Sequence, residues 1–559
     1  MARRRRARSE QDGSAVVIAL ALATIVLIVI GTTSGRVVSA TSGATGMLQR
    51  EQARTIAEER LMLTLSALDA GGADAAVRSG GAVDHTVQDD LVPDTDAGRP
   101  AGSVTVAVAS SADRGHDARQ GLHVTVTVDI GTARHIASAT VRPVVSMDHL
   151  LLSEFEVVDP VLRGQSRASC AATRSQGELA PGCVGTVVGP GPFDGPVHSN
   201  DAIVLAPGTT FASTLTTSHL AATAGGRIGP ALWGAEVADA PGAAPFGLLH
   251  QSELTLPRHT RDVLQGATVT CRLRGPTLLR FDGPRVRITS PRSVPRSGDV
   301  APEGASSEDA IGCLGIDRAA LGGVVVVELP PRAIIEVVRD PLMDCVDHPL
   351  GLVAGEDTER DWWCNGGDAF VWGRYQQART VIAEDNVQIV WDLEPGDASE
   401  AQFVGETDLL GLVAGDSIVL RRPVGRPIRR VAPFGLNLAF AGAYEPPFAA
   451  HPLDAPNELA TTWDSPRIVA ALSALRGSVT LQNPFRGEPH PGPLRFVGSQ
   501  ASRFRGVLTW EERNSRGTLV GTMGYPVEWS YDRRFATTGP PAMPLTGDGT
   551  IRILELDVG

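Results

Sequence analysis

The chain has 559 residues, a formal net charge of −13 and no lysine, so all 50 basic residues are arginine. An acidic body argues against a nucleic-acid partner. The absence of lysine excludes a P-loop, a Schiff base and a lysine isopeptide cross-link. Glycine and proline are abundant, with 61 and 39 residues, which is typical of many short strands and tight turns.

The N-terminus combines a basic block with a long uncharged segment. Five arginines lie within residues 3–8, and no charged residue occurs in residues 13–35. At about 1.5 Å per residue this segment can cross roughly 30 Å of hydrocarbon. We therefore predict a cytoplasmic leader at residues 1–13 and a transmembrane helix at residues 14–36, with the bulk of a single-pass protein outside the cytoplasm.

An amphipathic extension of the helix is predicted at residues 37–70. Three- and four-residue steps among charged residues connect Ile56, Ala57, Leu61, Thr64, Leu65 and Leu68, which form an apolar stripe. The stripe can pack on the chain's own domain or on neighbouring subunits. A helix over residues 14–69 would be about 84 Å long, and the glycines within residues 31–46 predict a local bend.

The remainder is predicted to be mostly β. We expect a small β-rich domain at residues 71–146, a main β-rich domain at 147–440 and a C-terminal part at 441–559 that continues the main domain. Alternation at residues 122–128 and 136–144 predicts a hairpin, and only residues 459–475 resemble a helix after residue 70. The fold class is thus mostly β with one long N-terminal α-helix. A β-solenoid and a sandwich both remain open, because no strict repeat appears.

Six cysteines lie in the predicted exported part, and an even set there predicts three disulfides. Sequential pairing is the simplest scheme. A metal site is a weaker interpretation, because no C-x-x-C occurs and the histidines are scattered; no metal or cofactor is predicted. The predicted pairs are Cys170 with Cys183, Cys271 with Cys313 and Cys345 with Cys364.

No catalytic motif is present: the chain has no Gly-x-Ser-x-Gly elbow, His-Glu-x-x-His or phosphate loop. His198, Asn200 and Asp201 suggest a catalytic or ligand role, but turn formation explains them better. Trp362 and Trp363, next to Cys364, could line a carbohydrate surface, whereas packing on a disulfide is the favoured interpretation. We predict no catalytic residues and no enzymatic activity.

Several segments resemble the PilX-type proteins of type IV pilus assembly, in the large form found in high-GC Gram-positive bacteria. The resemblance implies a cut by a prepilin peptidase between Gly13 and Ser14, and a helix embedded in the membrane or the pilus core. It also implies other pilin-like subunits or assembly proteins as partners. Ile18 departs from the glutamate of ordinary pilins, which bears on processing and fibre assembly. The matching segments are residues 11–20, 54–61, 147–160, 193–203, 275–277, 368–393, 408–423, 503–506 and 531–534.

The sequence therefore predicts a pilin-like, membrane-anchored structural or adhesive component of a type IV pilus or a related secretion apparatus. Its disulfide-stapled ectodomain would face the cell wall or a surface polymer. One alternative is a secreted or surface-attached binding module whose export signal is cleaved before Thr41. A second alternative is a cell-wall-active hydrolase, which would need acids that only the fold could bring together.

Overall fold

The computed structural model divides the chain into two compact units, which are Met1–Arg142 with Ile551–Gly559, and Pro143–Thr550. It describes residues 3–68, 85–91, 102–110, 122–171, 179, 181–189, 191–206, 209–219, 221–222, 228–229, 232–233, 249–295, 311–313, 315–340, 366–396, 407–421, 465–482, 492–513, 519–536, 538–546 and 551–558.

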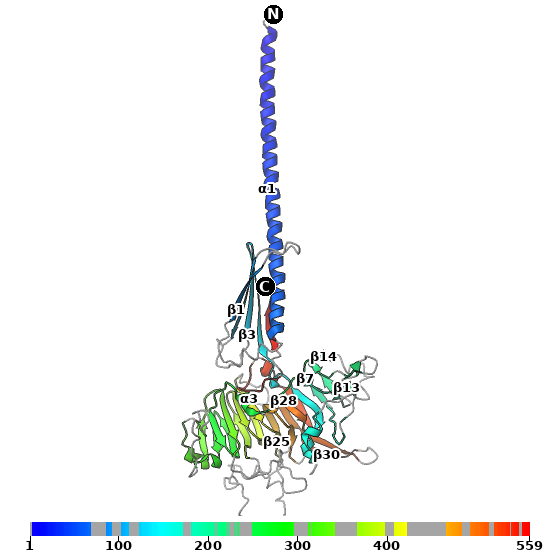
Figure 1. Ribbon diagram of the computed structural model, residues 1–559, viewed down its shortest axis with the longest axis vertical. Coiled ribbons are helices and arrows are strands. Elements are labelled where there is room, and N and C mark those ends of the chain that lie inside the picture. The colour runs from blue at the N-terminus through cyan, green and yellow to red at the C-terminus, as the bar shows by residue number, and fades with distance from the viewer. Residues whose placement is uncertain are drawn as a thin grey trace, which may run out of the picture. The chain divides into compact units, whose positions relative to one another are not determined.

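The first unit begins with one uninterrupted helix, α1 (Arg3–Ala67), drawn as a single long ribbon in Figure 1. The bend predicted at the glycines is not found. No atom outside the helix's own turns comes within 4 Å of the position that a Cβ would take at Gly31, Gly43 or Gly46. Continuous i to i−4 hydrogen bonding therefore outweighs the low helix propensity of these glycines.

The C-terminal part of α1 packs on an antiparallel sheet. Ala53, Ala57, Leu61 and Leu65 are buried and form one core with Val124, Val126 and Val128, among others. The sequence left open whether the stripe packs on the chain's own domain or on neighbouring subunits. The sheet of the same unit covers these four residues. The sheet order is β1 (His85–Leu91), β2 (Gly102–Ser110), β3 (Leu122–Ile130), β4 (Ala133–Pro143) and β32 (Ile551–Asp557).

The last strand corrects the predicted domain organisation. Residues 551–557 were expected to continue the main domain, whereas β32 completes the sheet of the first unit. His135 Nε2 lies 2.8 Å from the carbonyl oxygen of Val558. The alternation of a strand shows that one face is buried but not which sheet buries it, so the pairing was not visible in the sequence.

The second unit is built on two parallel ladders, and the chain passes from one to the other at each turn. The first ladder joins β15 (Cys271–Arg274), β20 (Ala333–Val338), β22 (Arg379–Ala383), β24 (Leu410–Ala414), β26 (Arg467–Ala474), β28 (Leu494–Arg505), β5 (Leu151–Val158), β7 (Val197–Ser199), β10 (Leu215–Thr217) and β14 (Leu249–His250). The second joins β16 (Thr277–Gly283), β21 (Ala369–Tyr375), β23 (Val387–Pro395), β25 (Ile418–Leu420) and β27 (Val479–Leu481).

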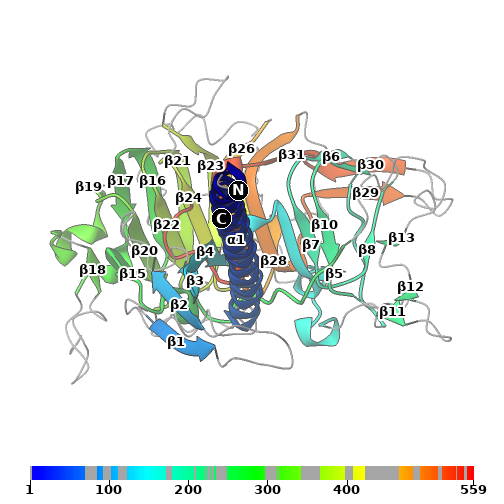
Figure 2. The ribbon, with the colours of Figure 1, turned by 90° about the horizontal axis from the view of Figure 1, so that it is seen from above.

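This alternation is the arrangement of a parallel β-solenoid, so of the two predicted architectures the solenoid is confirmed. Figure 2 shows β16, β21 and β23 in one layer and β15, β20, β22 and β24 in the other. Successive turns place apolar side chains in register. One buried column contains Ile335, Val381, Leu412 and Leu472, and these columns fill the interior of the solenoid.

Shorter elements complete the second unit. The antiparallel strands β17 (Arg285–Thr289), β18 (Gly312–Cys313) and β19 (Val325–Glu328) join the early turns, while β31 (Val527–Tyr531) pairs parallel with β28. The remaining elements are β6 (Gly191–Phe193), β8 (Ile203–Val204), β9 (Thr209–Phe211), β11 (Ala221–Ala222), β12 (Ile228–Gly229), β13 (Leu232–Trp233), β29 (Thr509–Arg513), β30 (Leu519–Gly524), the helix α3 (Thr260–Leu264) and the 3-10 helices at Ser146–Asp148, Pro160–Arg163, Arg167–Ser169, Pro291–Ser293, Arg318–Gly322 and Arg533–Ala536.

The helix predicted at residues 459–475 is wrong where the structure describes it. Residues 467–474 form β26, which is buried along nearly its whole length. A strand that is covered on both faces carries an unbroken apolar run, and such a run has no period that separates it from a buried helix.

Two of the three predicted disulfides are present, Cys170–Cys183 and Cys271–Cys313. Cys345 and Cys364 lie outside the described residues, as do Trp362 and Trp363. The Cys271–Cys313 bond joins two paired strands, β15 and β18, in which the two cysteines are direct neighbours.

Candidate functional site

The motif around His198 is part of a buried polar network. His198 and Asp201 are fully buried and Asn200 is nearly so. The ring nitrogens of His198 lie 2.8 Å from Thr216 Oγ1 and 2.8 Å from Asn200 Oδ1. Asn200 also donates to the carbonyl oxygen of Leu254 and accepts from its amide. These side chains hold neighbouring segments of the second unit together, and Asn200 bonds Leu254 rather than the local backbone that the turn interpretation predicted.

A buried ion pair lies beside this network. Arg505 contacts both carboxylate oxygens of Glu156, at 2.9 and 3.0 Å, and Ser153 donates to the same carboxylate. Burial alone would raise the pKa of Glu156, but the charge and hydrogen bonds of Arg505 outweigh it and hold the pKa below its usual value. Glu156 is therefore ionised and fully paired, which is a structural role.

Polar side chains also line the corner where the chain turns from the first ladder to the second. Asp368 Oδ1 accepts from the amide of Asn386 at 2.9 Å, and Asn386 Oδ1 accepts from the amide of Ser417 at 3.1 Å. In the same corner, Arg167 bridges Asp159 at 2.8 Å and Asp416 at 2.5 Å. These contacts pair the backbone amides that a buried corner would otherwise leave without partners.

The surface of α1 changes character along its length. From Leu22 to Ile30 each large apolar side chain is more than half exposed, from 52% at Val29 to 69% at Leu27. Consecutive residues point about 100° apart around a helix, so the apolar surface covers all sides of this segment. Within the part of the chain whose placement is described, no helix meets the length and hydropathy that a membrane crossing requires.

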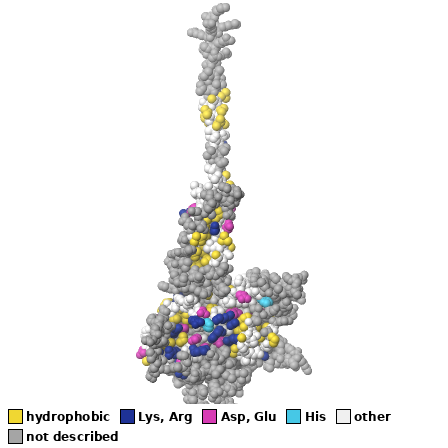
Figure 3. All heavy atoms as spheres, viewed as in Figure 1, with side chains coloured by type: hydrophobic (Ala, Val, Ile, Leu, Met, Phe, Trp, Pro, Cys, Tyr) yellow, Lys and Arg dark blue, Asp and Glu magenta, His cyan; other side chains and the backbone are white. Residues whose placement is uncertain are grey.

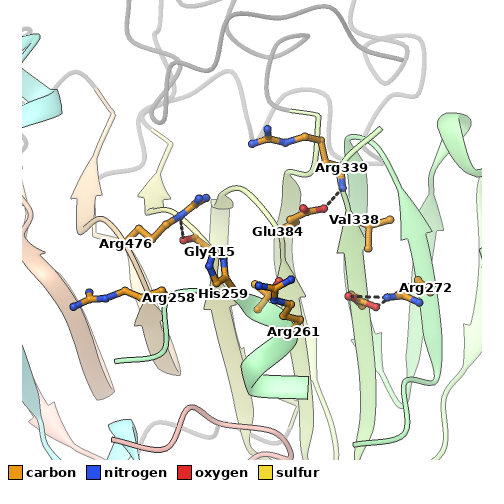
Figure 4. Close-up of a pocket in the computed structure, with 11 residues that line it drawn as sticks. Arg258, His259, Arg261, Arg272, Val338, Arg339, Glu384, Gly415 and Arg476 are labelled. Atoms are coloured by element: carbon orange, nitrogen blue, oxygen red, sulfur yellow. Dashed lines mark hydrogen bonds and ion pairs between the residues drawn. The ribbon is translucent and has the colours of Figure 1, made fainter. Parts of the chain in front are cut away.

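A groove with a charged lining lies in the described part of the second unit. It has a volume of about 330 Å³ and lies on the outer side of the first ladder, where α3 covers part of the strands (Figure 4). Basic side chains gather on this face of the unit (Figure 3). The groove is lined by five arginines, two glutamates and four other residues, namely Arg258, His259, Thr260, Arg261, Arg272, Glu336, Val338, Arg339, Glu384, Gly415 and Arg476.

The packing of α3 forms one wall of the groove. Val263 of α3 is buried in contact with the main hydrophobic core of the unit. This contact leaves His259, Thr260 and Arg261 at the rim. Gly415 lies next to Thr260 of α3, and a Cβ there would lie 2.1 Å from the carbonyl oxygen of Glu384. The close approach of the two turns therefore requires glycine at this position.

The arginines of the groove differ in how fully they are paired. Arg272 lies 2.8 Å from Glu336, and Arg339 Nε donates to Asp385 at 3.2 Å. Arg476 Nε donates to the carbonyl oxygen of Gly415 at 2.7 Å. Arg261 is 3.9 Å from Asp262, and its side chain is 81% exposed. Among the described residues, Arg261 thus has a long contact to the Asp262 carboxylate, whereas Arg476 donates to a neutral carbonyl oxygen and its charge acts on the nearby Asp416.

Further arginines lie near Arg258 of the groove. Arg258 and Arg503 both contact Glu154, at 2.9 and 3.4 Å. Burial lowers the pKa of Arg503, and the nearby charges of Arg258 and Arg167 lower it further. Three guanidinium groups therefore share one side of this face, with Glu154 between two of them.

Sequence reasoning did not identify this groove. Its lining residues are spread from Arg258 to Arg476, and only the stacking of solenoid turns brings them together. No local spacing signals such a site, because residues that are neighbours across turns are separated by insertions of unequal length. Single arginines in short strands look like ordinary solvated positions.

The other predicted sites stand as follows. Among the described residues, no group of three or more His, Cys, Asp or Glu side chains could hold a metal ion. Gly13 and Ser14 lie within α1, and nothing in the helix tests cleavage between them. Processing at this bond stays a prediction.

No protein-family model matches the chain, and no curated protein matches it. Among solved structures, the chain is similar to the competence-associated pilin ComZ from Thermus thermophilus. The match covers 91% of this chain and 97% of that chain, with 13% identity and a TM-score of 0.28. The likeness is weak.

Proposed function

We propose that the chain is a pilin-like structural or adhesive component, anchored by the N-terminal half of α1, that carries its β-solenoid outside the cytoplasm. One observation carries this proposal, the contrast along α1. The helix buries Ala57 and Leu61 on its own sheet, but exposes an apolar surface on all sides between Leu22 and Ile30. A surface of that kind is stable in lipid or among similar helices and costly in water.

The sequence supports the finer parts of the proposal. Arginines precede the apolar segment, which favours a cytoplasmic N-terminus. The resemblance of several segments to PilX-type proteins supports a place in a type IV pilus or a related secretion apparatus. We propose a non-catalytic solenoid, because the buried Glu156 and His198 serve its internal contacts.

Substitution within the apolar segment tests the anchor. We expect Ile28→Arg to release the protein from the membrane fraction, since an arginine at the centre of a membrane helix costs about 2.5–3.5 kcal/mol. The measurement is carbonate extraction followed by immunoblotting. Ile136→Arg is the matched control, because Ile136 is half exposed on β4, and it should leave the distribution unchanged.

Unchanged fractionation of the Ile28→Arg variant would contradict the anchor. Mass spectrometry of the mature N-terminus separates the remaining models. A start at Ser14 supports prepilin processing, and a start at Met1 or Ala2 supports an uncut anchor. A start at Thr41 would remove the exposed apolar segment from the mature protein and support a secreted binding module instead.

A further inference from the structure

We propose that the arginine-lined groove of the second unit binds the carboxylate groups of a linear acidic polysaccharide. This inference deepens the proposed function by naming the class of surface polymer that the solenoid would contact. It depends on the groove alone, and not on how α1 is anchored. The groove is open to solvent at Arg261 and His259, so a chain can enter it from the side.

The first argument is the availability of donors. Arg476 is held in place by its Nε contact to Gly415, which leaves its terminal nitrogens to face the groove (Figure 4). Arg261 extends from α3 with only a distant contact to Asp262. A guanidinium group binds a carboxylate through two parallel N–H···O bonds. These two arginines can therefore take one carboxylate each without breaking a strong ion pair.

The second argument is the spacing of the cations. Arg272, Arg339 and Arg476 belong to different turns, and β15 and β26 are four ladder steps apart. Adjacent strands lie about 4.8 Å apart, so the cations extend over about 19 Å of the solenoid. A single small anion cannot reach both ends of such a row. A linear polymer with repeated charges can.

The third argument is the chemistry of the lining. Glu384 lies among the arginines and is exposed, so the groove offers acceptors as well as donors. A polysaccharide supplies hydroxyl donors to such a carboxylate, whereas a polyphosphate supplies none. None of the described lining residues is Phe, Tyr or Trp, although single-stranded nucleic acids are usually bound by stacking on aromatic rings.

Binding to a defined oligosaccharide tests the proposal. The full-length chain in detergent micelles is titrated with polygalacturonate oligomers at 50 mM NaCl by isothermal calorimetry. The expected result is binding that weakens about three- to tenfold in Arg476→Gln, and more in the double variant Arg261→Gln/Arg476→Gln. Methyl-esterified oligomers, which lack the charge, should not bind.

Arg495→Gln is the matched control. Arg495 lies on β28, is 58% exposed and pairs with Glu528 at 3.5 Å, outside the groove. This variant removes the same charge and should bind like the unmodified chain. Equal weakening in the control, or no binding of polygalacturonate to the unmodified chain, would overturn the proposal.

Two further probes separate the ligand classes. Tighter binding of oligo-dT or of short-chain polyphosphate than of polygalacturonate would also overturn the assignment to an acidic polysaccharide. The assay does not measure membrane attachment. Absence of binding would therefore refute the proposed ligand of the groove. It would not affect the proposed membrane anchor, which the Ile28→Arg experiment tests.

Discussion

Asp368 is a fully buried carboxyl at a corner of the solenoid. Burial raises its pKa to about 8, the nearby charge of Asp385 adds to this effect, and hydrogen bonds from Asn386 and Gln388 oppose it. The raised pKa favours the protonated carboxyl at neutral pH. In the unfolded chain the same group has a pKa of about 3.9.

This difference links stability to pH. Between about pH 4 and pH 8 the folded chain holds one proton more than the unfolded chain at this residue, so its contribution to the free energy of unfolding falls as the pH rises. We expect Asp368→Asn to reduce the loss of thermal stability between pH 5 and pH 8, because asparagine does not titrate. Differential scanning fluorimetry at the two pH values measures the effect.

The control for this prediction is Asp282→Asn. Asp282 is about half exposed and lies 3.5 Å from Arg287, and surface pairs of this kind contribute little. The pH dependence of this variant should equal that of the unmodified chain. An unchanged pH dependence in Asp368→Asn would show that this carboxyl is ionised in the fold.

Substitutions in α1 test the packing of the first unit most directly. Leu61 is fully buried against the sheet, whereas Leu63, two residues further on, is 55% exposed. We expect Leu61→Ala to lower the free energy of unfolding of this unit by about 2–5 kcal/mol through loss of apolar burial and creation of a cavity. Leu63→Ala should change it by less than about 0.5 kcal/mol.

Hydrogen exchange of the β2 and β3 amides reads out both variants. The expected pattern is faster exchange in Leu61→Ala and unchanged exchange in Leu63→Ala. Equal exchange in the two variants would mean that burial of Leu61 does not stabilise the sheet. Leu61 and Leu63 have the same side chain, so the two variants differ only in the burial of the leucine that is replaced.

The elements also show which parts of this fold a sequence can predict. The hairpin of β3 and β4 was predictable, because Val124, Val126 and Val128 alternate with polar residues in a sheet with one covered face. β26 was not, since burial of Ile468 through Leu475 on both faces removes the alternation. Pairing between strands far apart in the sequence could not be predicted either. The charged groove depends on contacts between turns, and β32 depends on a partner more than 400 residues away.

On the scale of the whole molecule, the first unit is discontinuous, with the solenoid unit inserted in the chain between β4 and β32. We expect truncation after Thr550 to expose the edge of β4, because that edge loses its paired strand. Faster hydrogen exchange should appear in β4. Exchange in β24 should not change, since β24 lies between β22 and β26 in the other unit.

The outcome shows whether the two units unfold independently or together. Faster exchange in both strands would contradict the division into two compact units, because loss of β32 would then destabilise the solenoid as well. Unchanged exchange in β4 would mean that its edge needs no partner. The truncation must lie close to β32, because a cut further upstream, for example after Asn457, would also remove β26 and the solenoid turns that follow it.

The place of β32 has a consequence for the order of synthesis. The sheet that supports α1 receives β32 only after the whole solenoid unit has been synthesised, since His135 and Val558 are 423 positions apart in the sequence. Closing so long a loop is slow compared with local contacts. A chain that terminates early or loses its tail to a protease leaves β4 as an open edge, and such an edge is a template for aggregation. Closure of the first sheet by β32 thus depends on complete synthesis of the solenoid unit that separates β32 from β4 in the chain.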